Sequence, residues 1–123
     1  MPFYTAITCI DGRIHNSVIS YLQKRFEIEY VDLITEPGAV SFLAGEVDSP
    51  EAQSILRRTG ISLSAHSTKR IAIIAHDDCA GNPVAPKEQQ DQLRLARDFL
   101  ANKYRLPTIA LWVDNNWQVN EIT

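Results

Sequence analysis

The sequence predicts an α/β fold: a mainly parallel β-sheet flanked by helices, with an antiparallel edge strand at the C-terminus. Strand-like apolar runs alternate with helical patterns, which implies parallel strands joined by right-handed helical crossovers. The run at 3–10 is rich in β-branched and aromatic residues without clean polar alternation, as expected of a strand buried on both faces. The run at 70–76 is the most continuous apolar strand pattern in the chain. The segment 106–122 contains a strand pattern, a turn and a second strand pattern, which predicts a closing hairpin.

Elements in the first half of the chain follow from local patterns. The strand at 3–10 ends at the turn sequence 11–13, and a helix is expected from Asn16. The apolar residues of this helix recur at helical spacing: Val18, Ile19, Leu22 and Phe26. The run 28–35 then returns to a strand pattern.

The middle of the chain is less regular. The sequence at 36–39 breaks the strand, and 40–45 fits either a helical turn or an irregular segment. Ser49, Pro50 and Glu51 form a helix-start signature of N-cap, first-turn proline and first-turn acid. We expect that helix to reach about Arg58, to be interrupted at Gly60 and to resume at 62–67.

The second half begins with the strand at 70–76 and the loop 77–86. A helix follows at 87–104, with a buried stripe of Leu93, Ala96, Phe99 and Leu100. The run 106–114 predicts another buried strand containing Trp112, and the alternating 117–122 predicts the edge strand.

Composition limits the class of protein. The 123 residues, 45% hydrophobic and 22% charged, predict one domain over 1–123. A net charge of −3 argues against a nucleic-acid or anionic-membrane surface, which would need a basic excess. The chain shows no signal-peptide pattern and no apolar run of about 18 residues, so we expect a cytoplasmic protein.

Two clusters of reactive side chains follow the predicted strands. Cys9, Asp11 and Arg13 come at the end of the first, and His76 and Cys79 at the end of the strand at 70–76. Parallel strands bring both clusters to one sheet edge, where α/β proteins bind ligands. Two thiolates and one imidazole suit Zn²⁺, and three protein ligands leave a fourth position open, as in catalytic sites. Buried unligated cysteines or a disulfide remain the simpler alternatives.

The motifs CIDGR (9–13) and HDDC (76–79) resemble the two zinc motifs of β-class carbonic anhydrases. The order of segments around them, including 71–81 and 110–122, is similar over nearly the whole chain. The resemblance implies that Cys9, His76 and Cys79 bind one Zn²⁺ per chain. Asp11 and Arg13 would form the accompanying catalytic dyad. The implied reaction is reversible hydration of carbon dioxide to bicarbonate by zinc-bound hydroxide.

The resemblance also implies a homodimer and a small-molecule substrate. The chain begins directly at its first strand, so it is expected to be a small, truncated member that lacks the family's N-terminal helical arm. Gly38 and Ala39 are expected to keep a close backbone approach beside the pocket. Two alternatives stay open: a zinc hydrolase of another small electrophile, such as a carbon disulfide-like heteroallene, and a non-catalytic zinc-binding domain of the same fold.

Several polar residues near the motifs have no single assignment. Asp11 is either a zinc ligand or an acceptor for a zinc-bound group. Asp77 and Asp78 are expected to be solvated or to hydrogen-bond around the ligands. His15 is either a helix-start residue or a proton shuttle, because an imidazole titrates near neutral pH.

Overall fold

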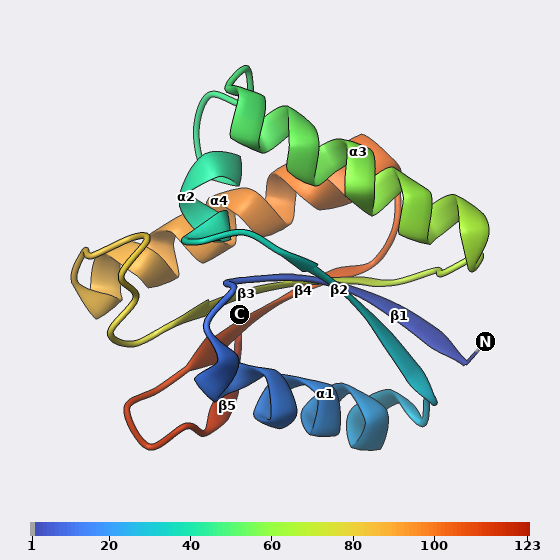
Figure 1. The fold of residues 1–123 in the computed structure, drawn as a ribbon, viewed down its shortest axis with the longest axis horizontal. Helices are drawn as coiled ribbons and strands as arrows, with labels where there is room; N and C mark the ends of the chain where they lie inside the picture. The colour runs from blue at the N-terminus through green and yellow to red at the C-terminus, as the bar shows by residue number, and fades with distance from the viewer. Residues whose placement is uncertain (1) are drawn as a thin grey trace.

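The sheet contains five strands in the order β2-β1-β3-β4-β5 in a computed structural model that describes residues 2–123 (Figure 1). The strands are β1 (Phe3–Thr8), β2 (Tyr30–Thr35), β3 (Ile71–His76), β4 (Thr108–Val113) and β5 (Val119–Ile122). The first four are parallel, and β5 pairs antiparallel with β4. The helices are α1 (Gly12–Phe26), α2 (Ala39–Leu43), α3 (Pro50–Ala65) and α4 (Pro86–Tyr104). The predicted fold class is confirmed.

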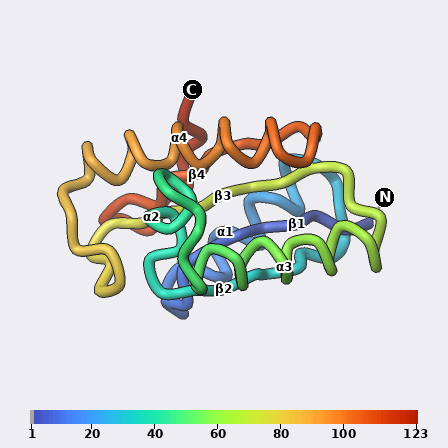
Figure 2. Tube along the Cα trace, turned by 90° about the horizontal axis from the view of Figure 1, so that it is seen from above, coloured from blue at the N-terminus to red at the C-terminus, as the bar shows by residue number. Residues whose placement is uncertain are grey.

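Helices cover both faces of the sheet, with α1 on one face and α2, α3 and α4 on the other (Figure 1). Viewed from above, α2 lies between α3 and α4 (Figure 2), and it contacts both. Two apolar clusters form the core. On the α1 face, the helix contributes Ile14, Val18 and Leu22, and on the other face α2, α3 and α4 pack on Ile7 and Ile73.

The central strand β3 is buried along its whole length. Ile71, Ile73 and Ala75 point into one cluster, and Ala72 and Ile74 into the other, as the two-residue period of a strand requires. Burying one such side chain contributes about 1.5–3 kcal/mol. Burial on both faces therefore stabilises β3, which is the middle strand of the sheet and has His76 at its carboxyl end.

The beginning of α1 differs from the sequence prediction. The helix begins at Gly12 rather than at Asn16, because the Asp11 carboxylate caps it by accepting a hydrogen bond from the Arg13 N–H at 2.9 Å. The segment 11–13 is thus a helix start and not a turn. This places Asp11 and Arg13 at the sheet edge, directly after β1.

The predicted interruption of α3 was wrong, because α3 continues through Gly60 to Ala65. Glycine costs a helix about 1 kcal/mol relative to alanine. Buried Ile55, Thr59 and Ser62 lie on both sides of it in sequence, so tertiary packing outweighs that cost. The predicted N-cap is confirmed, since Ser49 Oγ accepts a hydrogen bond from the Ala52 N–H. The segment 40–45, left open by the sequence, is mostly the short helix α2.

In the part of the chain that the structure describes, no helix has the length and apolar character required to cross a bilayer.

Candidate metal centre

Three potential metal ligands meet where β1 and β3 end. One ligand atom from each of Cys9, His76 and Cys79 lies within 4.8 Å of the others, and the two Sγ atoms are 3.7 Å apart. All three residues are buried, at 5%, 0% and 5% exposure. Residues 70 positions apart come together because β1 and β3 are parallel neighbours whose carboxyl ends share one edge.

The two nitrogens of His76 have different environments. Nδ1 lies 2.7 Å from the carbonyl oxygen of Asp77, which only accepts hydrogen bonds, so Nδ1 carries the proton. In the neutral imidazole, Nε2 therefore carries the lone pair, and this atom is buried without a hydrogen-bond partner among residues 2–123. A buried polar atom without a partner is costly unless a ligand satisfies it. A nitrogen lone pair beside two sulfurs is the donor set of a zinc site, so these residues fit that ion.

The pKa values of the two cysteines are shifted in opposite directions. The hydrogen bond from the Cys79 thiol lowers the pKa of Cys9 far below its usual range. The same hydrogen bond, together with burial, raises the pKa of Cys79. Backbone N–H groups partly offset this shift, since those of Gly81 and Asn82 lower the pKa of Cys79. The backbone therefore favours the thiolate form that a metal ion requires.

Two loops cross at close range beside the cysteines. A Cβ atom on Gly38 would lie 2.5 Å from the carbonyl oxygen of Gly81, and one on Gly81 would lie 2.6 Å from the Pro37 carbonyl carbon. Gly38 also has φ +62°, which glycine adopts without strain. The sequence indicated a close approach at Gly38 but gave no sign of its partner, Gly81. Backbone hydrogen bonds from Gly38 and Asp11 lower the pKa of Cys9. Gly38, one of the two residues at the crossing, thus also stabilises the thiolate form of Cys9.

Asp11 and Arg13 form an ion pair at the mouth of this site. Arg13 Nε donates to Asp11 Oδ1 at 3.0 Å, and Nη2 donates to Oδ2 at 2.6 Å. These hydrogen bonds lower the pKa of Asp11 to about 2, so its carboxylate is ionised at neutral pH. Asp11 Oδ2 is also 4.0 Å from His76 Nε2. The carboxylate thus faces the candidate metal position while it is bound to arginine.

Other residues near the site are also placed by the structure. Gln89 on α4 donates from Nε2 to the His76 carbonyl oxygen at 3.0 Å, an anchor that the helical pattern did not reveal. His15 Nε2 lies 3.0 Å from the Cys9 carbonyl oxygen, so this nitrogen hydrogen-bonds the backbone. Trp112 is buried, as the sequence predicted.

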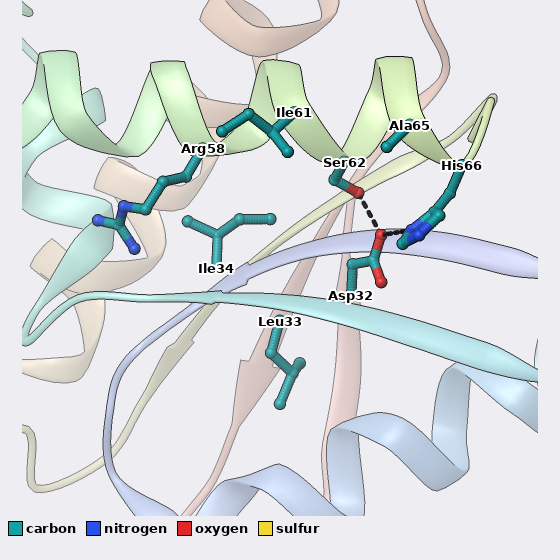
Figure 3. Close-up of a pocket in the computed structure, with 8 residues that line it drawn as sticks. All are labelled: Asp32, Leu33, Ile34, Arg58, Ile61, Ser62, Ala65 and His66. Carbon is teal, nitrogen blue, oxygen red and sulfur yellow. Dashed lines mark hydrogen bonds and ion pairs between the residues drawn. The ribbon is translucent and has the colours of Figure 1, made fainter.

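A separate polar cluster lines a cavity of about 310 Å³ between β2 and α3 (Figure 3). Asp32 Oδ2 accepts hydrogen bonds from Ser62 Oγ at 2.7 Å and from His66 Nδ1 at 2.6 Å. Ser62 Oγ is also 2.7 Å from Thr5 Oγ1 on β1. None of the three candidate ligands lines this cavity, and its hydrogen bonds tie α3 to the edge of the sheet.

Comparisons with known proteins identify a family and a shared fold. A family model described as "Putative carbonic anhydrase" matches residues 1–123. The structure is similar to a carbonic anhydrase from Glaciozyma antarctica, with TM-score 0.65, 14% identity, and coverage of 98% of this chain and 81% of that one. No curated protein sequence matches the chain.

Two further solved structures are similar. One is a tetrameric β-carbonic anhydrase from Sordaria macrospora, with TM-score 0.58, 12% identity, and coverage of 98% of this chain and 80% of that one. The other is the β-carbonic anhydrase CafA of Aspergillus fumigatus, with TM-score 0.55, 14% identity, and coverage of 98% and 74%. At these identities the structural likeness establishes the fold, and the family rests on the family model.

Proposed function

Because the chain belongs to this carbonic anhydrase family, we propose that it is a zinc-dependent lyase that hydrates carbon dioxide reversibly to bicarbonate. The observation that carries the proposal is the buried, unpaired Nε2 of His76 beside two buried thiols. Cys9, His76 and Cys79 would hold one Zn²⁺ per chain. When bound, zinc lowers the pKa of a coordinated water to about 7 and so supplies a nucleophile at neutral pH.

The dyad orients the reacting water in this proposal. Asp11 Oδ2 would accept a hydrogen bond from that water and so orient it toward the substrate. Arg13 keeps Asp11 ionised, since its hydrogen bonds are the largest cause of the low aspartate pKa. Two donors from Arg13 also hold the carboxylate in direction, so Asp11 acts as an acceptor and leaves the fourth metal position open.

Metal analysis and stopped-flow kinetics test this function. We expect about one zinc per chain and hydration activity that falls about 100-fold in Asp11→Asn, because the amide is a poorer acceptor and loses the ion pair. The Asp11→Asn variant is expected to keep its zinc. The matched control is Asp48→Asn, the same charge change at an exposed residue outside the site.

The outcomes separate the alternatives. A chain purified without chelator that holds no zinc and takes up none would contradict the metal site itself. Full zinc occupancy without hydration activity would leave a zinc hydrolase of another small electrophile, such as a heteroallene, or a non-catalytic zinc-binding domain.

We also propose that residues 1–123 act as one domain and assemble as a homodimer. Ile10 is 58% exposed between Cys9 and Asp11, so a partner that covered it would also shield the site from water. Light scattering is expected to give twice the chain mass of 13.8 kDa, and a monomeric mass would contradict the dimer.

A cytoplasmic location is proposed from the two unpaired cysteines, which a reducing compartment preserves. Cell fractionation tests it.

A further inference from the structure

The guanidinium of Arg13 is contacted by three separate elements. Besides Asp11 at the start of α1, it reaches the loop after β3, where Nη2 donates to the Asp78 carbonyl oxygen at 3.1 Å and Nη1 donates to Asp78 Oδ2 at 3.3 Å. On one face it packs over the ring of Trp117, with Arg13 Cζ 4.8 Å from the ring centroid. Trp117 belongs to the turn between β4 and β5. Segments more than 100 residues apart in sequence thus meet on one side chain.

The backbone conformation of Trp117 is unfavourable for its residue type. Its φ is +59°, in the left-handed region that glycine and asparagine adopt readily and that bulky residues rarely adopt. The turn needs only the Trp117 N–H, which donates to the Asp114 carbonyl oxygen at 2.9 Å, and a glycine would supply the same group. Turn geometry therefore does not explain the indole. The indole packs against the apolar cluster on the α1 face and lies over the Arg13 guanidinium, and these two contacts account for it.

Arg13 has restraints beyond its ion pair with Asp11. The Arg13 side chain is 47% exposed, and exposed ion pairs gain little because they must order flexible side chains in water. A planar guanidinium can stack on an aromatic ring and donate to two acceptors at the same time. An aromatic face and a second pair of acceptors therefore restrict the plane of the Arg13 guanidinium. Trp117 and Asp78 supply these two restraints.

We propose that Trp117 and Asp78 are positioning residues that hold Arg13 on Asp11. In this arrangement the Asp11 carboxylate stays turned toward Arg13 and does not occupy the fourth metal position. The catalytic consequence rests on the proposed function, and the effect on the fourth metal position rests on the proposed zinc site. The contact of Trp117 and Asp78 with Arg13 rests on neither.

Kinetics of two substitutions at one position test the role of the ring. Trp117→Leu is expected to lower kcat about fivefold, the size of one cation–π contact, with KM little changed. Trp117→Phe keeps an aromatic face and is expected to recover most of kcat. Asn115→Ala, an exposed change in the same turn, is the control for general disturbance of the hairpin. Equal kcat in the Leu variant and the wild type would overturn the proposal.

Two spectroscopic measurements do not depend on activity. In the zinc-free protein, Arg13→Leu is expected to shift tryptophan emission, and the shift should vanish in the Trp117→Phe background, where Trp112 remains. In the cobalt(II)-loaded protein, Trp117→Leu is expected to change the visible absorption as Asp11 moves to the metal. Asp11→Asn should abolish that change.

The two proposals fail in different ways. If the wild type binds zinc but does not hydrate carbon dioxide, the proposed function fails and the spectra still decide the positioning role. Unchanged emission in Arg13→Leu, or unchanged cobalt absorption in Trp117→Leu, would overturn the positioning role whatever the activity. Thermal unfolding and zinc content of each variant establish that it is folded and loaded.

Discussion

The Asp114 carboxylate organises the turn that presents Trp117. Oδ1 accepts hydrogen bonds from the N–H groups of Asn116 at 2.9 Å and Gln118 at 3.0 Å, and Oδ2 accepts one from Asn120 Nδ2 at 3.1 Å. The hydrogen bond from Gln118 is the largest cause that lowers the pKa of Asp114 below its usual 3.8. The charged form therefore stabilises the folded hairpin.

A pH-dependent stability difference follows for Asp114→Ala. Because the folded pKa is depressed, the carboxylate's contribution is fully present above pH 3.8, the ordinary value, and is lost as pH falls through the lower folded value. We expect the variant to unfold at a lower temperature than wild type near pH 6. That gap should narrow below about pH 4. Thermal unfolding of the zinc-free proteins measures it without metal release, and a constant gap down to about pH 2 would contradict the assignment.

His76 shows how much about a single residue of the site could be predicted from the sequence. Its type, and its spacing from Cys79, predicted a ligand from sequence, and both residues lie where a ligand set would need them. The choice of nitrogen could not be predicted, because it depends on the Asp77 carbonyl oxygen next to Nδ1. Roles for Asp78 and Gln89 were also beyond local patterns, since their partners are 65 and 13 residues away in the chain.

At the scale of elements, the face of α4 that packs on the sheet is expected to contribute most of what this helix adds to the stability of the fold. Leu93 is fully buried against the sheet, whereas Leu95, two residues later, is 58% exposed. The helical period of 3.6 residues accounts for the difference, because residues two apart point about 160° away from each other. The sequence stripe that contained Leu93 identified the buried face without a structure.

The pair of leucines on α4 is a matched test. Leu93→Ala is expected to lower the free energy of unfolding by about 2–5 kcal/mol, because it removes buried methyl groups and leaves a cavity. Leu95→Ala, the same change on the exposed face, is expected to alter it by less than about 0.5 kcal/mol. Urea unfolding monitored by circular dichroism measures both. Equal destabilisation by the two substitutions would contradict the packing of α4 on the sheet.

Helix boundaries were harder to predict than helix faces. The start of α1 was placed four residues late because the Asp11-Gly12 pair also fits a turn, and the capping hydrogen bond that decides between them needs helical geometry. The break at Gly60 was expected from local propensity, but the buried residues of α3 on both sides of it pack on the rest of the fold.

At the scale of the whole molecule, the site depends on two loops that no local pattern connects. The loop after β2 and the loop after β3 cross at Gly38 and Gly81, with no room for a side chain at either position. The same loops supply backbone hydrogen bonds to the sulfurs of Cys9 and Cys79. Metal affinity is therefore expected to depend on this crossing.

Two glycine substitutions test that dependence. Gly81→Ala would bring a Cβ to 2.6 Å from the Pro37 carbonyl carbon, so the loops must separate, and we expect zinc affinity to fall about tenfold or more. Gly60→Ala is the matched control, because a Cβ there meets nothing within 4 Å and alanine favours the helix. Competition with a zinc chelator measures both affinities. Unchanged affinity in Gly81→Ala would show that the crossing does not support the site.

The sequence by itself determined the alternation of strands and helices, the burial of β3 on both faces and the residues that end β1 and β3. It could do so because burial on both faces and helical periodicity are recorded in neighbouring residues. Tertiary structure alone decided which nitrogen of His76 faces the thiols, which loops cross at Gly38 and Gly81, and which side chains enclose Arg13. These features depend on parallel strands that place distant segments at one edge of the sheet, a proximity that sequence spacing does not contain.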